Sequence, residues 1–311
     1  MRIAVFGVGS VGSYFGWRLV QAGEEVIFIA RGENLRALNE KGLIVDTPDG
    51  NRFVQPVRSV GDPAQVGPVD AVIVGVKAWQ VTEAAEAIRP LIGPETFVVP
   101  LLNGVEAPTQ LSQTLGAEHV FGGLCYIVAL RVGPGHIHHA GMEPRILFGE
   151  LDNRVTDRAI RLKEAFQKAN TNVEIPPDIH VAMWNKFLFI AALSGAASVT
   201  RAPAGVLRSV PETRHMLQEL LKEVFMVARA RKIALKDDAV EAIMAVIDGL
   251  PPDGTASMQR DIMEGRPSEL SAQNGAVVRL ANEVGLAAPL NSFVYACLLP
   301  MELRARGELK F

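Results

Sequence analysis

Residues Ile3–Gly12 read IAVFGVGSVG, in which a short apolar run leads directly into the glycine pattern GxGxxG. In this pattern Gly7 permits a tight turn, Gly9 lets the backbone approach a pyrophosphate, and Gly12 lets a helix pack closely on the strand. The first turn of that helix offers N–H groups to the anion. The pattern predicts a dinucleotide-binding turn, with a turn of purely structural purpose as the alternative. Its cofactor-contacting residues are expected to be Gly7, Val8, Gly9, Ser10, Val11 and Gly12.

Apolar runs and amphipathic segments alternate along the first half of the chain. A helix is expected over Val11–Gln21, and strands over Val26–Ala30, Ala71–Val76 and Thr96–Pro100. Continuous Val, Ile and Phe runs are typical of strands that are buried on both faces of a parallel sheet. Repeated βα units with right-handed crossovers predict an open, doubly wound sheet. Residues Val120–Gly149 are richer in turn and strand signals, and we expect them to add edge strands that close this domain.

The second half of the chain has a different pattern. Strand signals stop after Pro176-Pro177, and helices are expected over 178–200, 211–231, 237–249, 268–285 and 291–306. The sequence therefore predicts an α/β protein with an N-terminal doubly wound Rossmann domain over residues 1–172 and a C-terminal all-helical domain over 173–311. A ligand cleft is expected at the carboxyl ends of the strands.

The composition is that of a folded, soluble chain. Of its 311 residues, 49% are hydrophobic and 21% charged, and 31 Lys and Arg against 34 Asp and Glu give a net charge of −3. Proteins that bind nucleic acid normally carry a basic excess, so no nucleic-acid partner is expected. The apolar run Phe187–Leu193 is far shorter than the about 20 residues that span a bilayer, so no membrane partner is expected. The N-terminus has no leader pattern, which predicts a cytoplasmic protein; a homodimer is left open.

Cysteine and histidine residues suggest no metal or thiol chemistry. Cys125 and Cys297 are far apart in sequence, have no catalytic signature around them, and are interpreted as small buried hydrophobic residues in a reducing compartment. Three histidines occur within residues 136–139, but only Glu143 is near them as a further ligand type. No metal site is expected there.

The residue after the second expected strand usually determines whether a dinucleotide site binds NAD or NADP, and here it is Arg31. NAD sites usually carry an acidic residue at this place, where it binds the ribose 2′-hydroxyl. The planar fork of Arg31 instead suits a 2′-phosphate, which predicts NADP(H). The alternative is a solvated Arg31, with Glu33 binding the ribose.

Five further segments occur in an order and spacing shared with one known family. They are residues 76–80 (VKAWQ), 101–105 (LLNGV), 184–187 (WNKF), Ser257-Met258 and Glu269. With these motifs the chain resembles, over nearly its whole length, the 2-dehydropantoate 2-reductases, also called ketopantoate reductases. The resemblance implies a Rossmann domain and a helical domain. It also implies that NADPH reduces a 2-oxo acid to a 2-hydroxy acid in pantothenate and coenzyme A synthesis.

Lys186 is the residue most expected to carry the chemistry. It directly precedes seven apolar residues, 187–193, and placing an ammonium beside such a helix costs several kcal/mol unless the charge is paired. Hydride addition to a ketone builds negative charge on the oxygen, which a cationic donor stabilises and protonates. The resemblance implies that Lys186 is this general acid. The alternative is a lysine that extends its charged end to solvent.

The resemblance assigns roles to four more polar side chains. It implies that Glu269 pairs with the cofactor, the active-site lysine or the substrate hydroxyl, and that Ser257 binds the substrate. It also implies that Asn103 touches both nicotinamide and substrate, and that Lys77 lies near the cofactor. From local sequence alone, these four could be a helix-dipole glutamate, a helix cap, a turn asparagine and a surface lysine.

The chain departs from the family in its expected substrate pocket. The family has asparagines four and eight residues after the lysine, where this chain has Ile190 and Ser194, and a further asparagine aligns near Ala204. Isoleucine cannot form a hydrogen bond through its side chain, and serine reaches less far than asparagine. The resemblance makes reduction of 2-dehydropantoate the main expectation. A different branched 2-oxo or β-keto acid is the alternative substrate, and a non-catalytic NADP(H)-binding regulator is a third reading.

Overall fold

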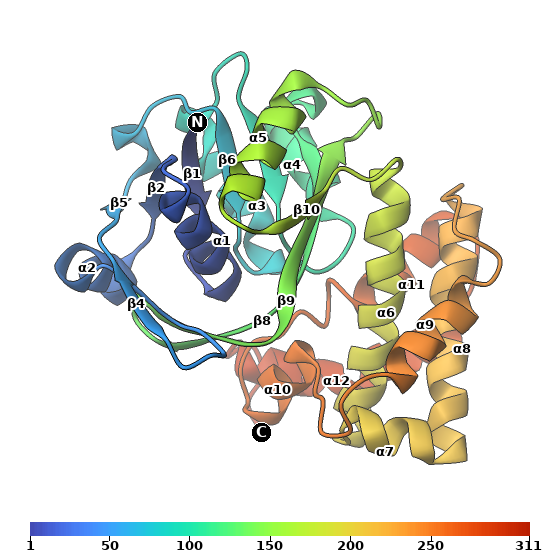
Figure 1. Cartoon of the computed structure of the whole chain (residues 1–311). Helices are drawn as coiled ribbons and strands as arrows, with labels where there is room; N and C mark the ends of the chain where they lie inside the picture. Colours follow the sequence, from blue (N-terminus) through green and yellow to red (C-terminus); the bar gives the residue numbers. More distant parts are fainter. The chain divides into compact units, whose positions relative to one another are not determined.

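The computed structural model describes the backbone of residues 1–311 and every side chain except that of Met142. The chain divides into two compact units, and Figure 1 labels their helices and strands. The first unit comprises Met1–Leu102 and Ala107–Ile179, and the second comprises Asn103–Glu106 and His180–Phe311. The first unit thus extends beyond residue 172, because β10 (Asn172–Glu174) pairs with another strand of this unit.

The first unit is built on a five-stranded, fully parallel sheet with the strand order β5-β2-β1-β6-β7. Its strands are β1 (Arg2–Phe6), β2 (Glu25–Ile29), β5 (Arg58–Val60), β6 (Ala71–Val74) and β7 (Phe97–Pro100). Its helices are α1 (Ser10–Gln21), α2 (Gly32–Lys41), α3 (Val81–Ala87) and α4 (Ala107–Leu115). The central strands are almost entirely buried, as their continuous apolar runs predict. The strand order reverses between β1 and β6, which is where a doubly wound sheet binds its ligand.

The strands expected within Val120–Gly149 are present, and they form part of a second sheet in this unit. These residues form the long hairpin of β8 (Phe121–Gly133) and β9 (His136–Glu150). Val120, just before β8, forms an isolated parallel bridge with Val98 of β7, but the hairpin is not a member of the parallel sheet. The hairpin instead joins β3 (Leu43–Asp46), β4 (Arg52–Gln55) and β10 in a sheet of its own. Figure 1 shows β8 and β9 curving together alongside β4.

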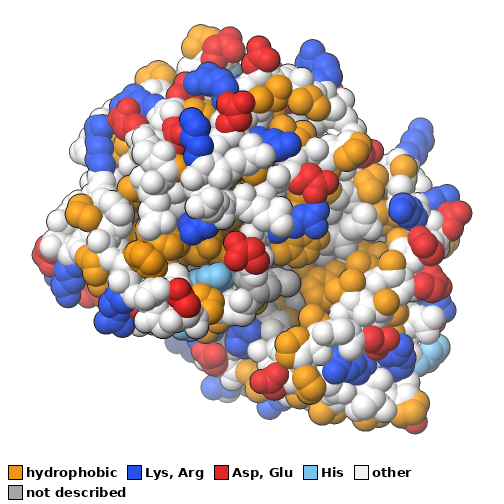
Figure 2. Space-filling view, viewed as in Figure 1, with side chains coloured by type: hydrophobic (Ala, Val, Ile, Leu, Met, Phe, Trp, Pro, Cys, Tyr) orange, Lys and Arg blue, Asp and Glu red, His pale blue; other side chains and the backbone are white. Residues whose placement is uncertain are grey.

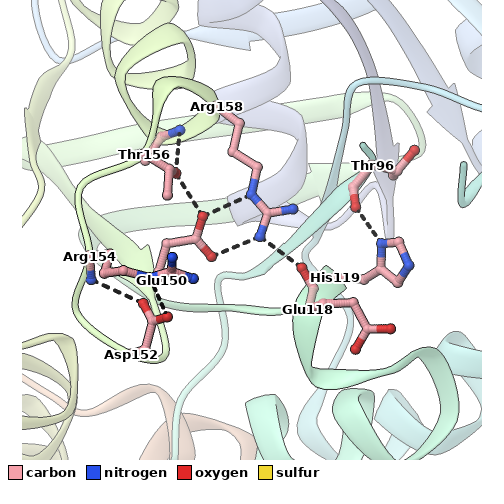
Figure 3. Close-up of polar contacts among 9 residues, drawn as sticks. Thr96, Glu118, His119, Glu150, Asp152, Arg154, Thr156 and Arg158 are labelled. Atoms are coloured by element: carbon pink, nitrogen blue, oxygen red, sulfur yellow. Dashed lines mark hydrogen bonds and ion pairs between the residues drawn. The ribbon is translucent and has the colours of Figure 1, made fainter. Parts of the chain in front are cut away.

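Helix α5 (Asp157–Lys168) is fixed to the end of this hairpin by one buried carboxylate (Figure 3). Glu150 accepts hydrogen bonds from the Thr156 hydroxyl at 2.7 Å and from two guanidinium nitrogens of Arg158, each at 2.8 Å. Arg158 also donates to the Glu118 carbonyl at 2.7 Å. Since Thr156 is the N-cap of α5, the same network sets the start of the helix.

The second unit is helical. Its helices are α6 (Ile179–Thr200, which begins at the last residue of the first unit), α7 (Ala204–Ser209), α8 (Pro211–Ala230), α9 (Ala239–Asp248), α10 (Ser257–Met263), α11 (Asn274–Glu283) and α12 (Pro289–Ala305). Helix α6 is apolar around most of its circumference, as expected of a helix at the centre of a core.

The membrane expectation needs one correction. Helix α6 has 22 residues, and its most apolar 18-residue window has a mean hydropathy of 1.3, so among the described residues it is long and apolar enough to cross a bilayer. The run Phe187–Leu193 considered in the sequence is only part of it. However, 67% of its most apolar window is buried inside the structure, which is typical of the core helix of a soluble protein.

Two smaller expectations are also wrong. The helix expected to begin at Ser268 begins at Asn274, because residues 269–273 form turns in front of α11. Cys297 is exposed rather than buried, since it lies off the buried stripe of α12 that contains Val294 and Leu298. Basic and acidic side chains are interspersed over the face shown in Figure 2, without a large patch of one sign.

Candidate active site

The glycine-rich turn follows β1 and packs against the segment that follows β6. Gly7 has a φ of +94°, and a Cβ on it would lie 2.7 Å from the Val76 backbone nitrogen. A Cβ on Gly12 would lie only 2.3 Å from the Gly7 carbonyl oxygen. Glycine is therefore required at both positions by close backbone approach.

Gly9 leaves an open approach to the first turn of α1. A Cβ at Gly9 would have the Gly75 carbonyl oxygen as its nearest atom, at 3.7 Å, which is an ordinary contact. Gly9 is the N-cap of α1, no side chain caps the helix, and its first turn holds no acidic residue. The backbone N–H groups of this turn can therefore bind an anion, and the residues fit a dinucleotide pyrophosphate.

Asn34, which the sequence reasoning missed, supports this turn from α2. Its amide nitrogen donates to the Val8 carbonyl at 2.7 Å, and its amide oxygen accepts from the Gly135 N–H at 2.7 Å. A lone asparagine on a helix carries no signal in the sequence, because its two partners are 26 and 101 residues away.

Arg31 follows β2, as the sequence predicts, and is the N-cap of α2. Its guanidinium forms an exposed ion pair with Glu83 at 2.9 Å, and both side chains are 66% exposed. An ion pair with this exposure is worth at most about 1 kcal/mol, so a phosphate can replace Glu83 as the partner. Glu33, the alternative ribose ligand, pairs with Arg36 at 3.7 Å. Lys77 is exposed and lies 5.9 Å from the centre of the Trp79 ring.

Lys186 lies on α6 of the second unit. It is only 8% exposed and is flanked in sequence by Trp184 and Phe187, whose rings contact each other edge to face at 5.5 Å. This degree of burial does not fit a lysine that extends its charge freely into solvent. Ile190 and Ser194 follow at four-residue intervals and share its side of the helix. Ile190 is partly buried against the core of the unit, and Ser194 is buried.

Glu269 and Asn103 are brought together although 166 residues separate them. The Asn103 amide donates to a Glu269 carboxylate oxygen at 2.9 Å, and Glu269 is 6% exposed. Next to Asn103, Gly104 has a φ of +98°, and a Cβ there would lie 2.9 Å from the Ala272 carbonyl oxygen. The Asn103–Glu106 segment therefore packs on the turn that carries Glu269.

Ser257 is the first residue of α10 and is exposed. Ala256 is the N-cap, so the helix-cap interpretation of Ser257 is wrong. Ala204 is buried at the start of α7. The grouping of Ser257 and Ala204 with the other site residues stays a prediction.

The histidines near residue 136 take structural roles. His136 bonds Asp46 across the second sheet at 2.7 Å, and hydrogen bonds from Arg52 and His136 lower the Asp46 pKa to about 2. The ring of His139 lies 4.9 Å from that of Tyr14. Across the described side chains, no cluster of three His, Cys, Asp or Glu could hold a metal ion.

The first unit thus carries a glycine-rich turn whose helix N-terminus can bind an anion, and the second carries a buried lysine and a partly buried amide–carboxylate pair. These features define a nucleotide-dependent oxidoreductase with a separate helical unit. The family model "Ketopantoate reductase PanE/ApbA" matches residues 3–153, and the model of the family's C-terminal domain matches residues 178–302. The chain belongs to the ketopantoate reductase family, whose members are NAD(P)-dependent oxidoreductases acting on CH–OH groups.

Individual relatives match over almost their full length. The chain is 32% identical to the "uncharacterized oxidoreductase YkpB" of Bacillus subtilis, over 96% of this chain and 98% of that one. It is 28% identical to a 2-dehydropantoate 2-reductase of a Nostoc species, over 99% and 98% of the two chains. The crystal structure of a ketopantoate reductase of this family from Ralstonia eutropha superposes with a TM-score of 0.89 at 29% identity, covering 98% of this chain and 100% of that one.

Proposed function

We propose that the protein reduces a 2-oxo acid to a 2-hydroxy acid with NADPH, and that its substrate is 2-dehydropantoate. The observation that carries the proposal is Lys186, a nearly buried lysine on the apolar helix α6, in the unit that also holds the partly buried Asn103–Glu269 pair. The free thiols Cys125 and Cys297 fit a reducing compartment, so the proposal includes a cytoplasmic location.

The side chains of the second unit account for the proton transfer. The bound nicotinamide supplies the hydride. Lys186 donates a hydrogen bond from Nζ to the ketone oxygen and, as negative charge grows there, transfers a proton that completes the hydroxyl group. Glu269 binds the polar groups around the reacting carbon, and Asn103 keeps its carboxylate oriented through their 2.9 Å hydrogen bond.

The proposal is tested by the steady-state loss of NADPH absorbance with a panel of 2-oxo acids. Turnover of 2-dehydropantoate with the highest kcat/KM of the panel supports the proposed substrate. A preference for another branched 2-oxo or β-keto acid supports the second candidate, which the replacement of an expected amide by Ile190 favours. Absence of turnover with every acid in the panel contradicts both candidates.

Arg31→Ala is expected to raise the KM for NADPH by about 10-fold or more and to leave the KM for NADH nearly unchanged. The variant loses one charge-assisted contact to the 2′-phosphate, worth about 1.5–3 kcal/mol, which NADH cannot form. Arg36→Ala is the matched control, because Arg36 lies on the same helix with similar exposure and pairs with Glu33. An equal loss with both cofactors contradicts the role of Arg31.

Ile190→Asn is expected to raise the kcat/KM preference for 2-dehydropantoate over 2-oxoisovalerate by about 10-fold. The new amide can bond the 4-hydroxyl of the former acid, and one such bond contributes about 1–1.5 kcal/mol. Ile190→Val is the control for altered packing, since it removes one methyl group without adding a polar atom. The prediction fails if the preference is the same in wild type and Ile190→Asn while both remain folded.

A further inference from the structure

We propose that Glu302 is a positioning residue for the active site. By accepting hydrogen bonds from Ser268, the residue before Glu269, it fixes the orientation of the Glu269 carboxylate. The inference rests on the proposed function, in which Glu269 acts at the reacting carbon. Glu302 lies on α12 and is 34 residues from Ser268 in sequence, and no sequence motif connects them.

Glu302 accepts three hydrogen bonds from Ser268. The Ser268 N–H donates to both carboxylate oxygens of Glu302, at 3.1 and 2.9 Å, and the Ser268 hydroxyl donates to one of them at 2.5 Å. Ser268 is 0% exposed and Glu302 is 4% exposed. Because hydrogen bonds to a buried charge are short and strongly directional, they fix the Ser268 peptide in one orientation.

Arg306, the C-cap of α12, completes the network. Its Nε donates to Glu302 at 2.6 Å, and its Nη2 donates to the Ser268 carbonyl at 3.2 Å. Both sides of the Ser268 residue are therefore held by α12, the N–H and hydroxyl by the carboxylate and the carbonyl by the guanidinium. The buried negative charge of Glu302 is compensated by Arg306, as a carboxylate at this depth requires.

The carbonyl of Ser268 belongs to the peptide bond that joins Ser268 to Glu269. The orientation of this carbonyl therefore sets the direction in which the backbone of Glu269 begins. Beyond Glu269 the turn is closed by the bond from the Gln273 N–H to the Glu269 carbonyl at 3.0 Å. Arg279 of α11 donates to the Ser271 carbonyl at 2.9 Å and to Glu106 at 2.7 Å, which ties the Asn103–Glu106 segment to the same turn. The turn that carries Glu269 is therefore held by hydrogen bonds at both ends, and Glu302 holds the end next to Glu269.

Glu302→Gln is expected to lower kcat by about 10-fold, because the amide keeps one acceptor oxygen but presents a donor where the second oxygen accepted. In the Glu269→Gln background the same substitution is expected to change kcat less than 2-fold, since a residue that acts through Glu269 has nothing left to position. Binding of NADPH, followed by fluorescence titration, is expected to change less than 2-fold in Glu302→Gln.

Glu223→Gln is the matched control. The Glu223 carboxylate also lies on a helix of the second unit and accepts from two backbone N–H groups at the start of α12, those of Leu290 at 2.7 Å and Asn291 at 2.8 Å. It is expected to lower the melting temperature, as Glu302→Gln does, while keeping kcat within 2-fold of wild type. Ser268→Ala, which removes only the hydroxyl donor, provides a milder variant if Glu302→Gln does not fold.

The outcomes distinguish a wrong role for Glu269 from a wrong role for Glu302. If Glu269→Gln itself leaves kcat unchanged, the proposed role of Glu269 is wrong. If Glu269→Gln lowers kcat but Glu302→Gln and Ser268→Ala lower only the melting temperature, Glu302 is merely structural and the inference is overturned. It is also overturned if the losses from Glu302→Gln and Glu269→Gln multiply in the double variant.

Discussion

Lys186→Ala is expected to lower kcat by about 10²–10⁴-fold while NADPH binding is retained. The ammonium acts on the alkoxide that develops on the substrate oxygen, so its contribution appears in the transition state and is small for the bound cofactor. The measurement is steady-state turnover on the best substrate of the panel, together with fluorescence titration of NADPH. Because the lysine is nearly buried in the core helix α6, the melting temperature of the variant is measured alongside turnover, so that a loss of kcat is separated from a loss of fold.

Lys222→Ala is the control for loss of a lysine from this unit. Lys222 lies on α8, its side chain is 48% exposed, and it pairs with Glu219 at 2.7 Å. Its removal is expected to leave kcat within 2-fold of wild type. Near-wild-type turnover of Lys186→Ala would contradict the assignment of the general acid and leave the proton without a donor among the proposed residues.

The parts of the fold that the sequence predicted are those controlled by local pattern. The strand Ile3–Phe6 and the glycine turn after it are recognisable because apolar runs and glycine spacing are dictated by neighbours in the chain. The long helices of the second unit, α6 and α8, were predicted to within a residue or two for the same reason. The family comparison confirms the resulting α/β class with a helical second half.

What could not be predicted depends on contacts between distant segments. The strands of the β8–β9 hairpin were expected, but their local pattern is the same whichever sheet they join, so their pairing with β3 in a second sheet could not be predicted. The start of α11 was placed too early because the residues from Ser268 to Gln273 have helical propensity, whereas the bonds from α12 to Ser268 hold them in turns. Likewise, the Asn34 bond to the glycine turn is visible only once the sheet has folded.

The same dependence explains which site residues could be anticipated. Lys186 is conspicuous because a charge within an apolar run has an energetic cost that can be read directly from the sequence. The pairing of Asn103 with Glu269 had no such signal and was suggested only by resemblance, since each residue has an ordinary local interpretation. Glu302 had no signal of either kind, because a carboxylate near the end of a helix is normally solvated.

Two single-methyl substitutions in the glycine turn are expected to separate cofactor binding from folding. Gly9→Ala is expected to weaken NADPH binding by about 10²-fold, because its methyl group occupies the approach of the pyrophosphate to the first turn of α1 and removes charge-assisted bonds worth about 1.5–3 kcal/mol each. Its fold is expected to be unaffected, since the new Cβ meets no atom closer than 3.7 Å. Fluorescence titration and the melting temperature measure the two effects.

Gly12→Ala, unlike Gly9→Ala, is expected to destabilise the fold itself. Its Cβ would lie 2.3 Å from the Gly7 carbonyl oxygen and 3.1 Å from Val5 Cγ1, so α1 must move away from β1 before the side chain fits. Overpacking of this kind costs about 1–3 kcal/mol or more, and the melting temperature is expected to fall by several degrees even without cofactor. If Gly9→Ala lowered the melting temperature, the new methyl group would not be free of contacts as the structure indicates. If it bound NADPH as wild type does, this turn would not be the pyrophosphate site. A Gly12→Ala protein with unchanged stability would mean that helix and strand are not packed at this distance.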